Sequence, residues 1–230
     1  MWLWIFFPLA LSLTSFIGTW AVWGENFCTV NHTTDCCKVP TISTSGTYAP
    51  ENSLFTATIN AGSFLFLLFC IFHHAHIMER NARQAAISRF ALAFGVVASM
   101  GSFAAGNCNP GYLTLLHHAG AGVSFMCICC YTVLLSALTG RCLLTGYEKL
   151  LYPLRIVSTV LQIILTICYT FCFAHHDYYY VHLSAVFEWI LSTNLELFEL
   201  SYIAEFSFFS TYMLSNLYSQ REEERPFMLV

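Results

Sequence analysis

Long apolar stretches alternate with short polar gaps along this chain of 230 residues. Six such stretches lie at about residues 2–23, 53–76, 87–107, 113–138, 153–174 and 182–214. Because a helix needs about 20 apolar residues to cross the hydrocarbon core of a bilayer, the pattern predicts an all-α integral membrane protein with six transmembrane helices. The last stretch exceeds a perpendicular span, so we expect it to tilt or to continue as a cytoplasmic helix.

Residues at the ends of these stretches agree with this prediction. Trp2, Trp4, Trp20 and Trp23 flank the first stretch, as aromatic residues do at membrane interfaces. That stretch has no basic residues before it and is longer than the apolar part of a signal peptide, so we interpret it as a retained anchor. Pro153 is predicted to begin the fifth helix, since proline suits the first helical turn.

Composition excludes an ordinary soluble domain. Hydrophobic residues make up 57% of the chain and charged residues 10%, whereas globular domains carry about 25% charged residues. We therefore expect one membrane domain over residues 1–214, including an outer loop at 25–52, and a cytoplasmic tail at 215–230. Membrane lipids are the expected surroundings, and no motif indicates a nucleic-acid partner or a cofactor.

Positive charge is distributed on one side of the predicted bilayer. Lys38 is the exception among nine Lys and Arg residues. The others lie in or beside the second and fourth gaps and in the tail: Arg80, Arg83, Arg89, Arg141, Lys149, Arg155, Arg221 and Arg225. Short cytoplasmic loops accumulate Lys and Arg, so both termini are predicted to be cytoplasmic. Residues 25–52, 108–112 and 175–181 are then on the outer side.

The outer loop carries candidate modification sites. Asn31 opens an Asn-His-Thr glycosylation sequon. Four cysteines are predicted to face the oxidising compartment, where disulfides persist: Cys28, Cys36, Cys37 and Cys108. Three pairings of these four are possible, and the sequence leaves them open. The cysteines within the spans are interpreted as small packing residues.

Acidic residues occur in the last apolar stretch. At 100° per residue, Glu196 lies about 80° and Glu199 about 20° around the helix from Glu188, whereas Glu205 points elsewhere. Carboxylates avoid lipid, so this stripe should face the bundle interior, a cavity or a partner. Two interpretations remain open: an ion or proton path, or structural hydrogen bonds to asparagines, hydroxyls or Arg155. Glu199 and Glu205 lie at a membrane depth that the Arg155 side chain can reach, so either is a candidate partner for it.

No catalytic motif stands out. The chain lacks GxSxG, a phosphate-binding loop and paired aspartates suited to intramembrane proteolysis. Eight of the nine histidines gather near membrane boundaries, but they lack the spacing of an HExxH metal site. We therefore expect neither an enzyme nor a resident metal.

Several short motifs occur along the chain in the order that is typical of one protein family. The first runs through the outer loop into the second span, and its matching positions are Pro40, Ile42, Ser43, Gly46, Pro50, Glu51, Phe55 and Asn60. The others comprise Gly106, Asn107, His117, Gly120, Arg155, His182, Glu188, Trp189 and Glu205. Together they resemble the Frag/DRAM/Sfk family, which includes the damage-regulated autophagy modulators. Ser53 and the Cys108-Asn109 pair depart from the family pattern, which leaves the outer disulfide arrangement open.

The resemblance implies a non-enzymatic membrane regulator, related to modulators of autophagy and cell death, that acts through protein or lipid contacts. One alternative is an ion channel, transporter or channel-modulating subunit that uses the acidic sixth helix. A second is a plasma-membrane scaffold for phosphoinositide-kinase assembly. The tail residues Glu224, Met228 and Leu229 are similar to an acidic dileucine sorting signal, which favours the lysosome or endosome over the plasma membrane. The segment at residues 40–52 is predicted to fold over the outer helix ends, because Pro40, Gly46 and Pro50 restrict its backbone.

Overall fold

Helices form every regular element in the described part of the chain. The computed structural model describes residues 2–29, 39–175 and 177–209, and no strand occurs within these ranges. Long helices are α1 (Phe6–Thr29), α3 (Glu51–Arg80), α4 (Ala85–Asn107), α5 (Thr114–Arg141), α6 (Glu148–Phe173) and α7 (Tyr178–Leu200). Short elements are η1 (Trp2–Ile5), α2 (Ile42–Ser45), η2 (Ala82–Gln84) and α8 (Ile203–Phe206). The all-α prediction is confirmed.

Five helices are long and apolar enough to cross a membrane. These candidate spans cover Phe6–Gly24, Glu51–Arg80, Ala82–Asn107, Thr114–Arg141 and Glu148–Phe173. The sixth predicted span corresponds to α7, whose 23 residues include the three glutamates of the acidic stripe. Each of these carboxyl groups makes transfer of the helix into lipid less favourable. A membrane crossing by α7 therefore stays a prediction.

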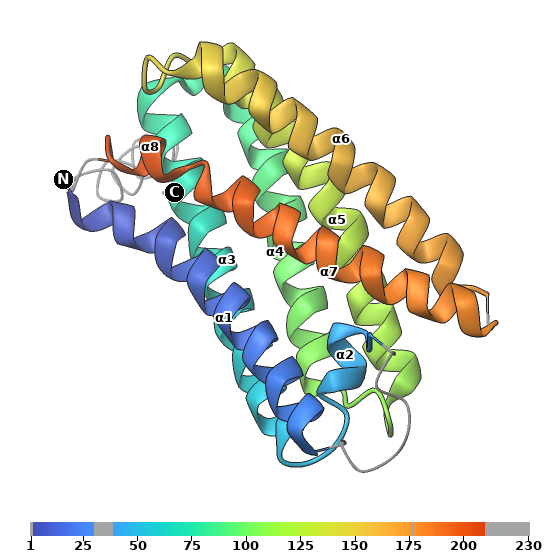
Figure 1. The fold of residues 1–230 in the computed structure, drawn as a ribbon. Coiled ribbons are helices and arrows are strands. Elements are labelled where there is room, and N and C mark those ends of the chain that lie inside the picture. The colour runs from blue at the N-terminus through green and yellow to red at the C-terminus, as the bar shows by residue number, and fades with distance from the viewer. Residues whose placement is uncertain (1, 30–38, 176, 210–230) are drawn as a thin grey trace, which may run out of the picture.

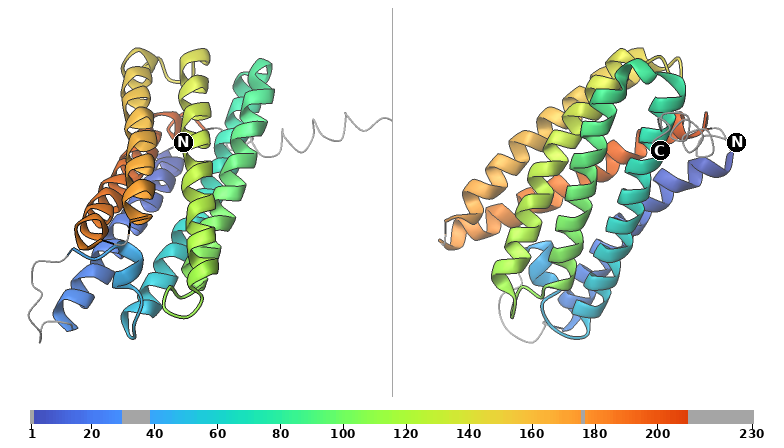
Figure 2. Two further views of the ribbon diagram at one scale, coloured as in Figure 1. Left: turned by 90° about the vertical axis from the view of Figure 1, so that its right-hand side faces the viewer. Right: turned by 180° about the vertical axis from the view of Figure 1, so that it is seen from behind.

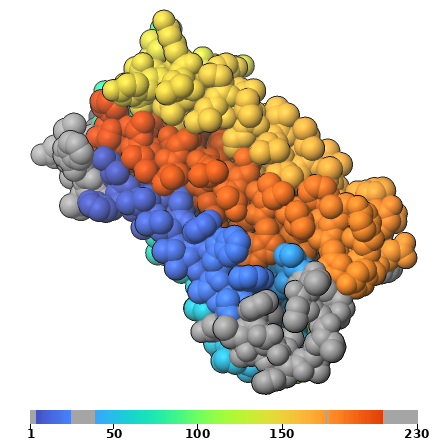
Figure 3. Space-filling model, in the orientation of Figure 1, coloured from blue at the N-terminus to red at the C-terminus, as the bar shows by residue number. Residues whose placement is uncertain are grey.

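The long helices form a closed ring (Figures 1 and 2). In ring order, α1 packs on α3, α3 on α4, α4 on α5, α5 on α6, α6 on α7, and α7 returns to α1. Figure 3 shows α7 lying between α1 and α6 on the face turned to the viewer. Acidic residues on the inner side of α7 are thereby covered by neighbouring helices rather than by lipid.

The two ends of the ring differ in charge. Residues 81–84 and 142–147 connect helices at one end, where α8 also packs against η1 and α1 (Figure 1). The Lys and Arg residues of the described ranges lie at or near this end, which we call the basic end. Helix α2 and residues 108–113 lie at the opposite end, which we call the α2 end.

Helix α7 ends earlier than predicted. The apolar stretch suggested one helix to about residue 214, but α7 stops at Leu200 and is followed by a turn and α8. At the break, Nη2 of Arg155 donates a 2.9 Å hydrogen bond to the Ser201 carbonyl. A side chain that occupies a helix carbonyl in this way interrupts the backbone ladder, so the long-helix prediction was wrong.

Helix α6 begins earlier than predicted. Its first residue is Glu148, and Pro153 lies inside the helix. One carboxylate oxygen of Glu148 accepts hydrogen bonds from the amides of Leu144, Thr145 and Gly146 at 2.7, 2.6 and 3.1 Å. This closes the preceding turn, in which Gly146 has φ 85°, a conformation that favours glycine. The acidic residue, rather than the proline, therefore sets the start of the helix.

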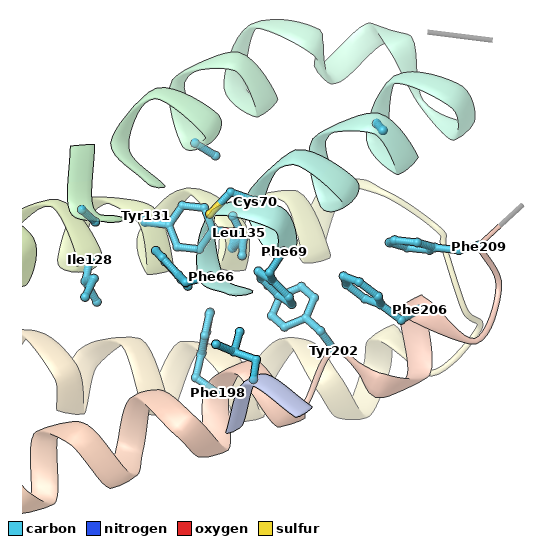
Figure 4. Packing of buried hydrophobic residues seen from close by; sticks show 14 residues of the cluster. Phe66, Phe69, Cys70, Ile128, Tyr131, Leu135, Phe198, Tyr202, Phe206 and Phe209 are labelled. Carbon is cyan, nitrogen blue, oxygen red and sulfur yellow. The ribbon is translucent and has the colours of Figure 1, made fainter. Parts of the chain in front are cut away.

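An aromatic core joins α3, α5, α7 and α8 (Figure 4). Phe69 of α3 stacks on Phe206 with ring centroids 5.2 Å apart and meets Tyr202 edge-on at 5.4 Å. Phe66 meets Tyr131 of α5 at 5.3 Å. Such pairs each contribute about 0.5–1.5 kcal/mol beyond burial, so this core fixes α8 against the basic end of the bundle.

Candidate functional site

The outer-loop motif folds into a short helix with its own cap. Thr41 precedes α2, and its side-chain oxygen accepts a 3.1 Å hydrogen bond from the Thr44 amide. Threonine is a favoured residue for this position. Gly46 follows α2 and lies against Phe55, where an added Cβ would be 2.4 Å from the Phe55 ring. The motif glycine therefore permits close contact between α2 and the start of α3.

Helix α2 docks on α7 through two hydrogen bonds. The Ile42 amide donates to the Glu188 carboxylate at 2.9 Å, and Nε1 of Trp189 donates to the Pro40 carbonyl at 3.0 Å. Ile42 is also buried with Val22 of α1 and Phe55 of α3. Two motifs separated by about 150 residues in the sequence thus meet at the α2 end. The predicted packing of residues 40–52 over the helix ends is confirmed.

A second group of motif residues ties α3 to α4. Asn60 and Asn107 exchange amide hydrogen bonds at 3.2 and 2.7 Å. Thr56 donates to the Gly106 carbonyl at 2.9 Å. Because Gly106 has no side chain, Ile59 approaches its backbone closely. The two asparagines were candidate partners of the glutamates, and that prediction was wrong because each satisfies the other.

His117 and Gly120 connect α4 to α5. Nδ1 of His117 lies 2.8 Å from the Ala105 carbonyl and 3.0 Å from the Cys108 carbonyl, at the end of α4. Gly120 faces Gly101 so closely that an added Cβ would be 2.7 Å from the Gly101 carbonyl oxygen. His182 lies on α7, where its ring meets Tyr178 with centroids 4.4 Å apart, away from these contacts.

Arg155 forms a buried ion pair near the basic end. Its side chain is fully buried, and Nη1 lies 2.5 Å from the Glu205 carboxylate. The other carboxylate oxygen of Glu205 is 3.4 Å from Nε2 of His73. Nη1 also donates to the Thr139 hydroxyl at 2.7 Å, and the guanidinium lies 3.5 Å from the centre of the Tyr202 ring. Of the two glutamates predicted to reach Arg155, the structure selects Glu205.

The acidic stripe of α7 lines a partly open cavity of about 180 Å³ between the helices. Glu188, Glu196 and Glu199 all border it and are nearly buried. The carboxyl of Glu196 accepts a 3.3 Å hydrogen bond from Ser192 on one oxygen, whereas its other oxygen has no hydrogen-bond partner among the described residues. The predicted inward orientation of the stripe is confirmed, and its cavity is a candidate binding site.

Some predicted sites fall outside the described residues. These are Asn31, Cys36, Cys37, Glu224, Met228 and Leu229. The side chain of Cys28 is likewise not described, and Cys108 forms no disulfide with another described cysteine. Glycosylation, the outer disulfides and the sorting signal therefore stay predictions. Within the described ranges, no group of three His, Cys, Asp or Glu side chains is placed to hold a metal ion.

Sequence reasoning missed two parts of the polar framework. His73 and Tyr202 complete the surroundings of the Arg155–Glu205 pair, and the motif residue Trp189 donates a hydrogen bond to the Pro40 carbonyl that was not predicted. Their signals were weak, because a histidine near a span end and a tyrosine in an apolar run are common membrane-interface residues. Only the folded arrangement brings them to these partners.

Replacing Trp189 with Phe should loosen the α2 end without unfolding the bundle. The change keeps an aromatic ring but leaves the Pro40 carbonyl without its indole donor, which costs about 1 kcal/mol. We expect faster proteolysis within residues 39–50 and an almost unchanged melting temperature. Limited proteolysis with mass spectrometry measures this, with Trp20→Phe as the control because Trp20 contacts the Trp189 ring. Equal cleavage rates in the two variants would contradict the role of the hydrogen bond.

Comparison with known proteins identifies relatives along most of the chain. The family model described as "Frag1/DRAM/Sfk1/Cwh43P N-terminal domain" matches residues 1–209. Transmembrane protein 150A of Xenopus laevis is 28% identical over an alignment covering 90% of this chain and 85% of that protein. The human protein of the same name is 27% identical, covering 88% and 83%. "Modulator of macroautophagy TMEM150B" of Danio rerio is 26% identical, covering 83% and 80%.

No solved structure matches the chain significantly. The family assignment therefore rests on the sequence match, which extends across every long helix of the ring and the docked α2 segment. The motif residues that connect α2, α3, α4 and α7 all lie within the matched range. The chain belongs to the Frag1/DRAM/Sfk1 family.

Proposed function

We propose that this chain is a non-enzymatic regulator of macroautophagy that acts through protein or lipid contacts at its membrane-embedded surface and basic end. One observation carries the proposal: the polar motif residues bond mainly to one another. Glu188 accepts a hydrogen bond from the Ile42 amide, Asn107 donates one to Asn60, and Arg155 forms an ion pair with Glu205. Groups used in this way stabilise a particular helix arrangement rather than present a catalytic constellation. The TMEM150B relatives are named modulators of macroautophagy, which supports this assignment.

The proposal includes six membrane crossings with both termini in the cytoplasm. Alternate connections lie at opposite ends of the ring, and η1 meets α8 at the basic end (Figure 1). Cytoplasmic loops are enriched in Lys and Arg, so we assign the basic end to the cytoplasm. In this orientation α2 faces the lumen or the cell exterior.

A cellular experiment tests the regulatory role. Cells in which the gene is deleted should show altered turnover of a lipidated autophagosome marker during starvation, and re-expression of the chain should restore it. Imaging the re-expressed, tagged chain should place it on lysosomes or endosomes, with a shift toward the plasma membrane when Met228 and Leu229 are both replaced by Ala. Unchanged marker turnover in both fed and starved deletion cells would refute the proposed function.

A cation channel or channel-modulating subunit is the second candidate. The specific observation in its favour is the acidic stripe, since three glutamates of α7 border one cavity between the helices. Purified protein in liposomes separates the two candidates. Cation flux that disappears in the Glu196→Gln, Glu199→Gln variant would favour the channel, whereas a regulator without transport activity gives the background flux of empty liposomes.

A further inference from the structure

We propose that the cavity between the helices binds a small organic ammonium ion, with its nitrogen beside Glu196 and Glu199 and its apolar part against the cavity wall. This inference goes beyond the regulatory function, because it assigns a ligand to the interior of the bundle. The cavity of about 180 Å³ is similar in size to an engineered apolar cavity of about 150 Å³ in another protein, which holds benzene. A ligand of one aromatic ring and one amine therefore fits the available volume.

The carboxyl groups supply the site for the charged end of the ligand. Glu196 is 6% exposed and lines the cavity, and one of its carboxyl oxygens, itself buried, has no hydrogen-bond partner among the described residues. Glu199, which is 3% exposed, follows one helical turn later on the same wall. A buried acidic group without a partner is costly. An ammonium group supplies both the opposite charge and three N–H donors, so it complements the acidic position at Glu196 and Glu199.

The hydroxyl groups of the cavity are largely used elsewhere. Thr19 donates to the Ser15 carbonyl at 2.9 Å, and Ser63 donates to the Ile59 carbonyl at 2.7 Å. Ser102 and Ser124 bond to each other at 2.7 Å. Since these side chains already have partners within the protein, the carboxyl oxygen that lacks a hydrogen bond among the described cavity residues belongs to Glu196. This concentrates recognition of a ligand on one acidic position.

The remaining wall is suited to a hydrocarbon body. Its apolar side chains come from five helices of the ring and include Leu11, Phe55, Phe66, Phe125, Ile128 and Leu195. Apolar walls with a few convergent polar groups are typical of small-molecule sites. Ions such as Ca²⁺ instead require roughly six to eight oxygen ligands, whereas the carboxyl groups of this lining all come from α7 and much of the remaining wall is apolar. The cavity therefore favours an organic cation over a metal ion.

The test uses the full chain in lipid nanodiscs with benzylammonium as the probe and benzyl alcohol as its neutral counterpart. Isothermal titration calorimetry should show saturable binding of benzylammonium at least tenfold tighter than that of benzyl alcohol. The Glu196→Gln, Glu199→Gln variant should lose at least tenfold in benzylammonium affinity. Glu79→Gln, on α3 and outside the cavity lining, is the matched control and should bind as the original chain does.

Three results would overturn the proposal. The first is that the double-glutamine variant binds benzylammonium as tightly as the original chain does. The second is that the original chain binds benzyl alcohol as tightly as benzylammonium. The third is that sodium or calcium displaces benzylammonium as effectively as a second organic amine does. Glu196→Gln alone provides a further variant that removes the carboxyl with the unpartnered oxygen. Because glutamine has the same shape as glutamate, we expect its melting temperature to equal or exceed that of the original chain, so loss of binding would report on the site rather than on folding.

Discussion

Replacing Arg155 with Met should destabilise the protein by about 3–5 kcal/mol, the typical cost of removing one partner from a buried ion pair. Arg155 is fully buried, and Glu205 is 1% exposed. The substitution keeps a long side chain but removes the donors to Glu205, Thr139 and the Ser201 carbonyl. The connection between α7 and α8 depends on the last of these contacts. We therefore expect loss of α8 packing together with a lower free energy of unfolding.

Denaturant unfolding in detergent micelles, followed by tryptophan fluorescence, measures the effect of Arg155→Met. Arg141→Met is the matched control, since Arg141 is exposed at the end of α5 and should change stability by less than about 0.5 kcal/mol. Adding Glu205→Gln to Arg155→Met should recover part of the loss, because the buried carboxylate is then removed as well. A single Arg155→Met variant as stable as Arg141→Met would show that the pair is not a structural requirement.

Replacing Gly120 with Leu should separate α4 from α5 and prevent correct packing of the bundle. An added Cβ at Gly120 would be 2.7 Å from the Gly101 carbonyl oxygen and 2.9 Å from the Ala105 amide nitrogen. Both obstacles are backbone atoms of α4, so rotation of a side chain cannot relieve them. Overpacking costs about 1–3 kcal/mol where neighbours can adjust, and a backbone clash should exceed this range. Small residues at such crossings are what allow membrane helices to approach closely.

Gly122 provides the control for Gly120. It lies two residues later on α5, is exposed, and an added Cβ there would meet no atom within 4 Å. Gly122→Leu should therefore retain the stability and monodisperse elution of the original chain, whereas Gly120→Leu should aggregate or elute as misfolded protein in size-exclusion chromatography. Similar behaviour of the two variants would contradict the close α4–α5 crossing.

The predicted site residues show what helical periodicity can predict and what it cannot. The 100° rotation per residue placed Glu188, Glu196 and Glu199 on one side of α7, and all three border the cavity. The same reasoning left Arg155 with two possible acidic partners. Choosing Glu205 required the turn after α7, which depends on the Arg155 bond to the Ser201 carbonyl. Periodicity also left asparagines among the possible partners of the glutamates, because it carries no information on which helices are neighbours.

Helix boundaries likewise fall into those that hydropathy predicts and those that tertiary contacts set. Hydropathy indicated where α3, α4 and α5 lie, since each is a continuous apolar run. It extended the last helix too far because residues 201–209 are as apolar as those before them. A tertiary contact from α6 ends that helix. The start of α6 was predicted at Pro153, whereas a carboxylate bonded to three amides sets it at Glu148.

The sequence by itself determined the helical class, the positions of five of the six predicted spans and the inward direction of the acidic stripe, because these follow from hydrophobicity and spacing along one helix. The tertiary structure decided the closed ring, the docking of α2 on α7, the Arg155–Glu205 pair and the cavity. These features join residues far apart in the chain, and their energies depend on which side chains the fold brings within hydrogen-bonding or van der Waals distance. Local sequence patterns do not specify that proximity.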